Sequence, residues 1–279
     1  MFYPCRGGKK AGLGAVKRAE KEARAVICLT PSESKRLIAK AVAKLPEVKQ
    51  ALETRKVIIS LGTTNAFVAE EILGISLPKA KYAGGLINSH GLSALSAAKR
   101  LRPFVLIEGK AADISIEEAL RGFSADDVYI KGANAVDQWG NAGILVGHET
   151  GGTTVGKALP ILLSRGSVFL IPVGLEKLVP SVIEASQRCP GLLRVRQATG
   201  LPVGLMPVVN AKVVTEIQAL EFLCGVSAFH IASGGVFGAE GSIVLALEGT
   251  ESRVTAAFEL VCGIKGEPHI NAIRNGDEG

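Results

Sequence analysis

Cysteine, histidine and long apolar runs are all scarce in this chain, and each scarcity excludes a class of protein. The five cysteines are scattered with no Cys-x-x-Cys pair, and the four histidines do not fall at zinc-ligand spacing. No apolar run reaches the length of about 18 residues that a membrane helix needs, and residues 1–29 lack the apolar core of a signal peptide. We therefore expect reduced thiols in a soluble, cytoplasmic protein with no metal, no cofactor and no membrane partner.

Aromatic residues are also few, at 5% of the chain, whereas glycine is abundant with 33 residues. The glycines show no three-residue period, which excludes a collagen-like protein, and a hydrophobic content of 47% supplies a core and excludes disorder. Many glycines beside few aromatics are typical of tight strand-to-helix turns around a small-molecule site. No Gly-x-Ser-x-Gly elbow, catalytic Cys/His signature or dinucleotide fingerprint is present.

The net charge of +6 is concentrated at the N-terminus. Residues 1–29 carry seven basic side chains against two acidic ones, so the other 250 residues are close to neutral. The favoured interpretation of this basic N-terminal arm is a solvated amphipathic helix. The alternative is an arm that contacts phosphate, nucleic acid or an acidic partner surface. No DNA-binding module is indicated, so nucleic acid is not an expected partner.

Residues 30–199 alternate between helical and strand patterns. A helix is predicted from Thr30, which is followed by Pro31 and Glu33 as in a helix start, up to Pro46. Further predicted elements are strands at 56–60, 104–107, 127–130, 144–146 and 168–173, and helices at 66–73, 115–121 and 153–164. Alternation of this kind predicts an α/β domain with a Rossmann-like parallel sheet covered by helices on both faces.

The pattern changes after about residue 200. Strands are predicted at 203–209, 228–232 and 242–247, and helices at 213–223 and 250–261. This βαββα order predicts a small α+β (ferredoxin-like) lid domain with an antiparallel sheet over residues 200–268. Residues 269–279 are expected to form a polar, frayed tail.

The best candidate for a ligand site is the turn after the 56–60 strand, with Gly62, Thr63, Thr64 and Asn65. Gly62 permits a tight turn, and the following helix N-terminus offers unpaired N–H groups to an anion. The hydroxyls of Thr63 and Thr64 add donors, so a phosphate or carboxylate is the expected ligand. The alternative is an ordinary strand-to-helix turn capped by threonine.

A second glycine-rich stretch, Gly151 to Ala158, has the spacing of a P-loop up to its last position. Ala158 stands where a Ser or Thr would hold magnesium, so an ATPase is disfavoured. Thr153, Thr154 and Lys157 remain candidate ligands for an anion, with a simple tight connection as the alternative.

Other polar residues follow predicted strands. Asn88, Ser89 and His90 come after a short apolar pair, and Lys131 and Asn134 follow the 127–130 strand. His148 and Glu149 are the only adjacent His/carboxylate pair and are candidates for acid–base work. Because neighbours on a strand point to opposite faces, a direct partnership between them is disfavoured, and an exposed polar loop is the alternative.

Taken in order, these segments resemble the superfamily of ribose-5-phosphate isomerase (the A type), sugar-phosphate isomerases and CoA transferases. Residues 56–73 resemble the isomerase's strand and phosphate loop, residues 127–145 its strand and Asp-Gly-Ala-Asp motif, and residues 201–249 its small lid domain. Residues 132–172 are also similar to methylthioribose-phosphate isomerases. The resemblance spans roughly residues 30–250 and implies a phosphate-binding cavity and an isomerase-like or transferase scaffold.

The sequence departs from the isomerase pattern at its catalytic carboxylates. Lys131 and Asn134 stand where the motif has two aspartates, and Gly156 matches the catalytic glutamate if the lysine after it is Lys157. If the protein is an enzyme, Glu149, His148 and Asp137 are the candidate catalytic residues. We expect a homo-oligomer that binds a small anionic, phosphorylated metabolite, with chemistry other than ribose-phosphate isomerisation. The alternative is a non-catalytic metabolite sensor or assembly component on the same fold.

Overall fold

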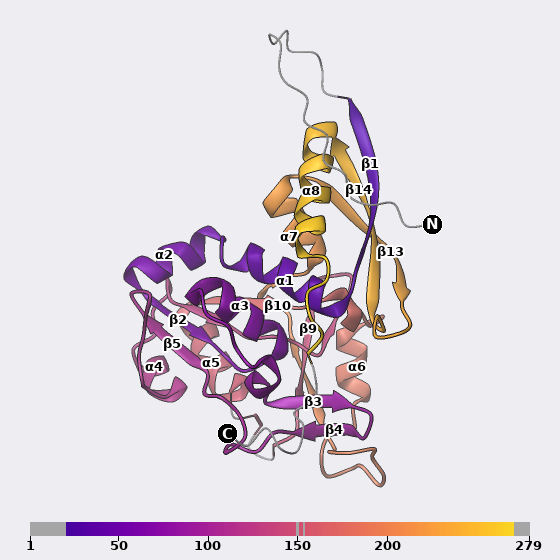
Figure 1. Cartoon of the computed structure of the whole chain (residues 1–279). Helices are drawn as coiled ribbons and strands as arrows, with labels where there is room; N and C mark the ends of the chain where they lie inside the picture. The colour runs from indigo at the N-terminus through magenta and orange to yellow at the C-terminus, as the bar shows by residue number, and fades with distance from the viewer. Residues whose placement is uncertain (1–20, 149–150, 153, 271–279) are drawn as a thin grey trace.

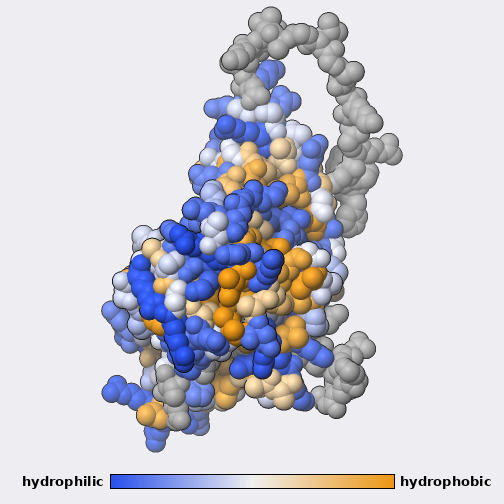
Figure 2. Space-filling view, turned by 90° about the vertical axis from the view of Figure 1, so that its left-hand side faces the viewer, coloured by the Kyte–Doolittle hydropathy of each residue, from blue (hydrophilic) through white to orange (hydrophobic). Residues whose placement is uncertain are grey.

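The structure is a computed structural model, and it describes residues 21–148, 151–152 and 154–270. Two lobes are visible, a larger α/β lobe and a smaller lobe of three strands and two helices (Figure 1). Figure 2 shows the molecule from the side, with apolar residues exposed on both lobes. No helix in the described part of the chain is both long and apolar enough to cross a membrane.

A six-stranded sheet forms the centre of the larger lobe, in the order β12-β10-β7-β2-β5-β6. Its strands are β2 (Lys56–Ile59), β5 (Phe104–Ile107), β6 (Lys110–Ala111), β7 (Val128–Ile130), β10 (Val168–Pro172) and β12 (Lys212–Val214). Strands β2, β7, β10 and β12 run parallel, whereas β5 is antiparallel to β2 and β6 to β5. The expectation of a wholly parallel sheet is therefore corrected to a mixed sheet, because the chain returns to β2 from the opposite end after a long excursion over residues 74–103.

Helices cover both faces of this sheet, as predicted. They are α1 (Pro31–Val42), α2 (Pro46–Thr54), α3 (Thr63–Leu73), α4 (Ile116–Arg121) and α5 (Val155–Arg165). Helix α6 (Val182–Arg188) packs instead on β9 (Ala142–Val146) and β11 (Gly204–Val208) of a second sheet, and two 3₁₀ turns, η1 (Lys79–Tyr82) and η2 (Leu175–Lys177), complete the helical segments of this lobe. Alternate strand residues enter two separate apolar clusters. Ile58 and Tyr129 pack with α4 and α5, whereas Val57 and Ile130 pack with α1 and α3. This two-sided burial explains why the strands read as short continuous apolar runs.

The start of α1 follows the prediction. The Thr30 hydroxyl accepts a hydrogen bond from the backbone N–H of Glu33 at 3.4 Å, and the Glu33 carboxylate accepts one from the Thr30 N–H at 2.9 Å. This reciprocal pair satisfies two N–H groups that a helix start leaves unpaired. Helix α1 ends at Val42, before the predicted end at Pro46. Pro46 instead lies in the first turn of α2, a helix that was not predicted from the sequence.

The smaller lobe contains an antiparallel sheet in the order β1-β14-β13. It is built from β1 (Glu22–Leu29), α7 (Glu216–Cys224), β13 (Ser227–Gly234), β14 (Ser242–Thr250) and α8 (Glu251–Ile264). Both helices lie on one face of the sheet (Figure 1), where Ile27 and Leu245 pack against Val254 and Val261. Residues 22–29 of the basic arm thus form an edge strand and not the expected helix, since Ile27 and Leu29 face the core while Val26 and Cys28 face outward.

Residues 200–215 also differ from the expected lid domain. Strand β11 (Gly204–Val208) pairs with β9 (Ala142–Val146), which pairs in turn with β8 (Ala135–Val136), and β12 joins the central sheet. The helix predicted from residue 213 begins at Glu216, because Thr215 and Gln218 form a capping box directly after β12. A hairpin of β3 (Gly85–Asn88) and β4 (Gly91–Ala94) completes the larger lobe.

Candidate functional site

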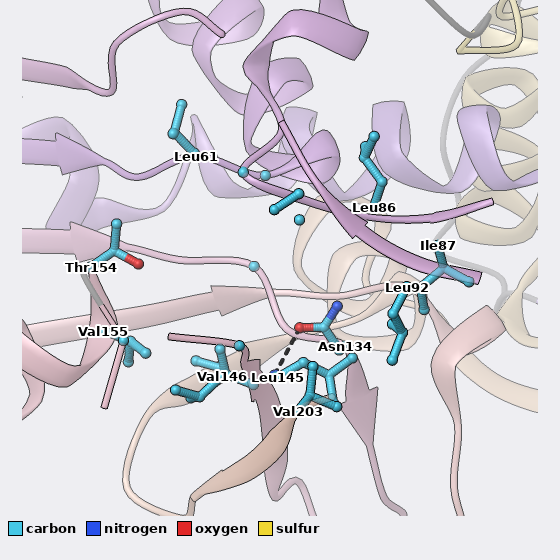
Figure 3. Close-up of a pocket in the computed structure, with 18 of the residues that line it drawn as sticks. Leu61, Leu86, Ile87, Leu92, Asn134, Leu145, Val146, Thr154, Val155 and Val203 are labelled. Atoms are coloured by element: carbon cyan, nitrogen blue, oxygen red, sulfur yellow. Dashed lines mark hydrogen bonds between the residues drawn. The ribbon is translucent and has the colours of Figure 1, made fainter. Parts of the chain in front are cut away.

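A cavity of about 480 Å³ lies at the carboxyl ends of β2 and β7. Most of its wall comes from four places in the sequence: the turn into α3, the β3–β4 hairpin, residues 131–134 after β7, and the end of β9 with the turn into α5. Further lining residues are Arg100, Lys177, Leu201 and Val203. Parallel strands of one sheet end at the same edge, which is why turns far apart in sequence meet here. Apolar side chains form much of the surround in Figure 3, among them Leu61, Leu86, Leu92, Val146 and Val203.

The first turn of α3 lies at the cavity and contains a buried hydroxyl that has no partner among the described residues. Gly62, Thr63 and Thr64 all line it, and α3 begins at Thr63 without a side-chain cap. Thr64 is only 2% exposed, and its Oγ1 has no hydrogen-bond partner among the described residues. A buried hydroxyl without a partner costs stability, so this one indicates a ligand that accepts its hydrogen bond. Such a ligand would also lie near the positive N-terminal end of the α3 dipole.

Two lysines, Lys131 and Lys177, line the same cavity. The Lys131 Nζ donates to the carbonyl oxygens of Leu61 and Gly132, both at 3.3 Å, and the Lys177 Nζ donates to that of Ala133 at 3.0 Å. Burial, reinforced by the charge of Lys177, lowers the pKa of Lys131 to about 8. Burial and the charge of Lys35 lower the pKa of Lys177 to about 8, although Glu176 and Glu216 act in the opposite direction.

The described lining contains no aspartate or glutamate to balance these cations. It contains one further basic group, Arg100, whose guanidinium lies beside Gly84 at the cavity edge. A cavity with lysines and an arginine but without a carboxylate favours an anionic occupant. The described residues hold no cluster of His, Cys, Asp and Glu suited to a metal ion.

Several predicted ligand residues do meet in this cavity. Asn134, His148 and Thr154 line it together with the turn into α3 and Lys131. The Asn134 Oδ1 accepts a hydrogen bond from the Leu145 N–H at 3.0 Å, and Figure 3 shows its amide nitrogen directed away from that bond. His148 lies at the end of β9. Glu149 and Thr153 lie outside the described residues, so the structure places neither of them.

The glycine-rich stretch before α5 reaches the cavity, but its lysine does not. Gly152 and Thr154 line the cavity, whereas Lys157 forms an ion pair with Glu117 of α4 at 2.7 Å on the outer surface. A Cβ on Gly156 would lie 2.2 Å from the carbonyl oxygen of Gly151, so the stretch is also a tight connection that requires glycine. The structure therefore does not bring Lys157 to the cavity, and its described partner is Glu117.

Asn65 and Asp137 have structural partners away from the described lining. The Asn65 amide donates to the carbonyl oxygens of Ser60 and Ile130, which ties the ends of β2 and β7 together. Asp137 is 3% exposed and accepts hydrogen bonds from the backbone N–H groups of Trp139, Asn141 and Val182. Burial opposes its charge, yet these bonds and the Asn141 amide hold the pKa of Asp137 below its ordinary value. Asp137 thus braces the β8–β9 turn against α6 and lies outside the described lining, so the structure does not bring it together with His148 at the cavity.

Asn88, Ser89 and His90 form the tip of the β3–β4 hairpin. The Asn88 Oδ1 accepts from the His90 N–H at 2.9 Å, which closes the turn. These three exposed residues are not part of the described lining, although the strands on either side of them are. The structure therefore places these three predicted ligand residues in the turn of an antiparallel hairpin, outside the described cavity lining.

Sequence reasoning missed Lys177, Arg100 and the glycines at 84 and 85. Lys177 lies in η2, shortly after β10, so the rule that singled out Lys131 after β7 also applied to it. Arg100 and the glycines carry no such signal, because they reach the cavity only through the fold of the excursion between α3 and β5. No protein-family model, curated protein or solved structure matches this chain.

Proposed function

We propose that the cavity binds a small metabolite that carries a phosphate group, on a Rossmann-like scaffold similar to sugar-phosphate isomerases and CoA transferases. The observation that carries the proposal is the buried Thr64 hydroxyl without a partner among the described residues, at the N-terminus of an 11-residue helix. Lys131, Lys177 and Arg100 supply positive charge in a described lining that holds no carboxylate. A phosphate seated at Gly62–Thr64 accepts from these groups together.

The chemistry performed on this ligand is proposed to differ from ribose-phosphate isomerisation. That reaction moves a proton between adjacent carbons and needs a carboxylate or another base close to the carbon. Lys131 and Asn134 stand at the positions of the family's carboxylates, and Asp137 is occupied by backbone N–H groups. A non-catalytic sensor on the same fold is the second candidate, and the exposed apolar sheet described below favours it.

A thermal-shift assay with ribose 5-phosphate, inorganic phosphate, a CoA ester and unphosphorylated ribose tests the binding site. At about 100 times the dissociation constant, a phosphate ligand stabilises the folded state by about 2.7 kcal/mol and raises the melting temperature by about 5 °C or more. Ribose without phosphate should give no shift. A shift that is equal for ribose and ribose 5-phosphate would contradict the proposal.

Thr64→Val separates the site from the fold. The change keeps the shape and removes a buried hydroxyl without a described partner, so the free protein should be as stable as the wild type or slightly more stable. The loss of a hydrogen bond to a charged group, about 1.5–3 kcal/mol, should weaken phosphate binding about tenfold or more. Thr54→Val, on the exposed end of α2, is the matched control and should leave binding unchanged.

We further propose that the protein forms a homo-oligomer through the outer face of the small sheet. Val26, Phe229 and Ile231 are each more than half exposed there, and Phe237 of the following loop is fully exposed. A small sheet with helices on one face buries its other face against a partner. Light scattering should show an oligomer at micromolar concentration, and Phe229→Ser should shift it toward the monomer. A wild-type monomer would contradict the proposal.

A further inference from the structure

The cavity contains two lysines, Lys131 and Lys177, and their positions suit a chemical step as well as phosphate binding. We propose that Lys131 is a nucleophile that forms an imine with the carbonyl carbon of a short phosphorylated aldehyde or ketone. The inference rests on the proposed function, because the phosphate at Gly62–Thr64 is what holds the carbonyl group near this amine.

The position of Lys131 carries the first part of the argument. Its Nζ lies 3.3 Å from the carbonyl oxygen of Leu61, the residue directly before the Gly62–Thr64 turn. A ligand with its phosphate at that turn therefore has its next few carbons beside the Lys131 amine. Holding a nucleophile and a carbonyl in one enclosed space replaces an encounter in solution with a pre-arranged contact.

The surroundings of Lys131 carry the second part. Carbonyl oxygens hold its Nζ in place, but no described carboxylate of the lining pairs with it. Burial and the neighbouring charge of Lys177 bring its pKa to about 8, so a useful share of the amine is neutral near pH 7.5. A lysine that is desolvated beside a second cation is the arrangement that activates amines for imine formation.

Lys177 is the less suitable nucleophile of the two. Its Nζ donates to the Ala133 carbonyl, one residue beyond the Lys131–Gly132 peptide, and the carboxylates of Glu176 and Glu216 favour its charged form. We assign it the role of the second cation, which makes protonation of Lys131 less favourable and attracts the anionic ligand.

The chemistry balances without an oxidant or a reductant. The lone pair of the neutral Lys131 amine attacks the carbonyl carbon, and the C=O π electrons move to the oxygen, which takes up a proton. The carbinolamine then loses this hydroxyl as water while the nitrogen gives up its protons, which leaves a C=N bond. One water is released for each imine formed.

Pyridoxal 5′-phosphate, an aldehyde with a phosphate group, is the probe. The full-length protein is incubated with it at pH 7.5 and treated with sodium borohydride, which delivers a hydride to the imine carbon and fixes the adduct. Peptide mass spectrometry then compares Lys131 with Lys110, an exposed lysine of β6 that serves as the internal reference. Lys131 should be modified at least about tenfold faster than Lys110, and inorganic phosphate should slow only the former.

Lys131→Arg is the matched variant, because it keeps the positive charge and cannot form an imine. It should bind the probe without a reducible adduct, and Lys131→Met serves if the arginine variant does not fold. An adduct at Lys177 and not at Lys131 would overturn the assignment. If Lys131 is modified no faster than Lys110, the imine is overturned. The proposed function would still stand in that case if the probe raises the melting temperature of the wild type but not that of Thr64→Val. No melting shift with any phosphate compound would overturn both.

Discussion

Arg36 and the lysine pair of Lys131 and Lys177 are all half-buried in the larger lobe but have opposite surroundings. Arg36 on α1 forms ion pairs with Glu70 at 2.6 Å and with Glu71 and Glu267 at 2.9 Å, and its guanidinium lies over the Phe67 ring. Although burial opposes its charge, the bonds to Glu267 and Glu70 raise the pKa of Arg36 above its ordinary value. Among the described residues, the hydrogen-bond partners of Lys131 and Lys177 are carbonyl oxygens, and the pKa values of both lysines fall to about 8.

This difference separates a cation that holds the fold together from cations kept for a ligand. The Arg36 ion pairs join α1, α3 and the segment after α8, so they stabilise the folded protein without any ligand. The two lysines repel each other and line a cavity, so their charges destabilise the free protein and are compensated only when an anion binds. The contrast is testable because the two groups should respond oppositely to neutral substitution.

The largest expected effect concerns catalysis, because the described cavity lining contains no carboxylate that could act as a general base. Loss of a general base typically costs about 10²–10⁴-fold in rate. We therefore predict no useful interconversion of ribose 5-phosphate and ribulose 5-phosphate in a coupled assay. Turnover near about 1 s⁻¹ that is abolished by Glu149→Gln or Asp137→Asn would contradict this prediction.

Arg36→Met should destabilise the protein by about 3–5 kcal/mol, because it leaves buried carboxylates without their partner. Glu70, at 8% exposure, would keep its ion pair with Lys79 and its hydrogen bond from the Leu77 N–H but lose the guanidinium. Urea unfolding at pH 7 measures the loss. Arg102→Met is the control, since Arg102 pairs with Asp113 in full solvent and should lose less than about 1 kcal/mol. An equal loss of unfolding free energy in Arg36→Met and Arg102→Met would contradict the distinction between the buried Arg36 network and the exposed Arg102–Asp113 pair.

Lys131→Met and Lys177→Met should each stabilise the free protein at pH 7, by about 1–3 kcal/mol. The folded-state pKa of about 8 lies below that of an unfolded lysine, near 10.4, so between these values the unfolded chain binds more protons. Wild-type stability therefore rises with pH across this window, and the penalty is fully present below about pH 8. Unfolding curves at pH 7 and pH 10 should show the advantage of the variants shrinking. An advantage that is unchanged at pH 10 would contradict the charge-based cause.

The sequence predicted most strands and helices of the larger lobe because their residues are buried on both faces and carry strong local signals. It failed where pairing is decided at long range. Residues 22–29 become a strand by pairing with β14, more than 200 residues away in the sequence. Strand β11 likewise pairs with β9 and not with the strands that follow it.

The residues of the candidate site were likewise predictable where they directly follow a strand, and not where long-range folding brings them to the cavity. Gly62, Thr64 and Lys131 follow parallel strands directly, so the rule that ligands bind at the carboxyl ends of such strands finds them. Asp137 and Asn88 also follow or border strands, but hydrogen bonds to nearby backbone groups occupy them, and those bonds depend on the turn geometry. Arg100 arrives through a 30-residue excursion whose path no local pattern encodes.

The most direct test of the account is a crystal structure of the protein grown with ribose 5-phosphate. The account predicts a phosphate at the start of α3, within about 2.7–3.2 Å of the Thr64 Oγ1 and the first N–H groups of the helix, with its sugar carbons beside Lys131. A phosphate bound at the Gly151–Gly152 turn, or outside the cavity, with the Thr64 hydroxyl still unpartnered, would contradict it.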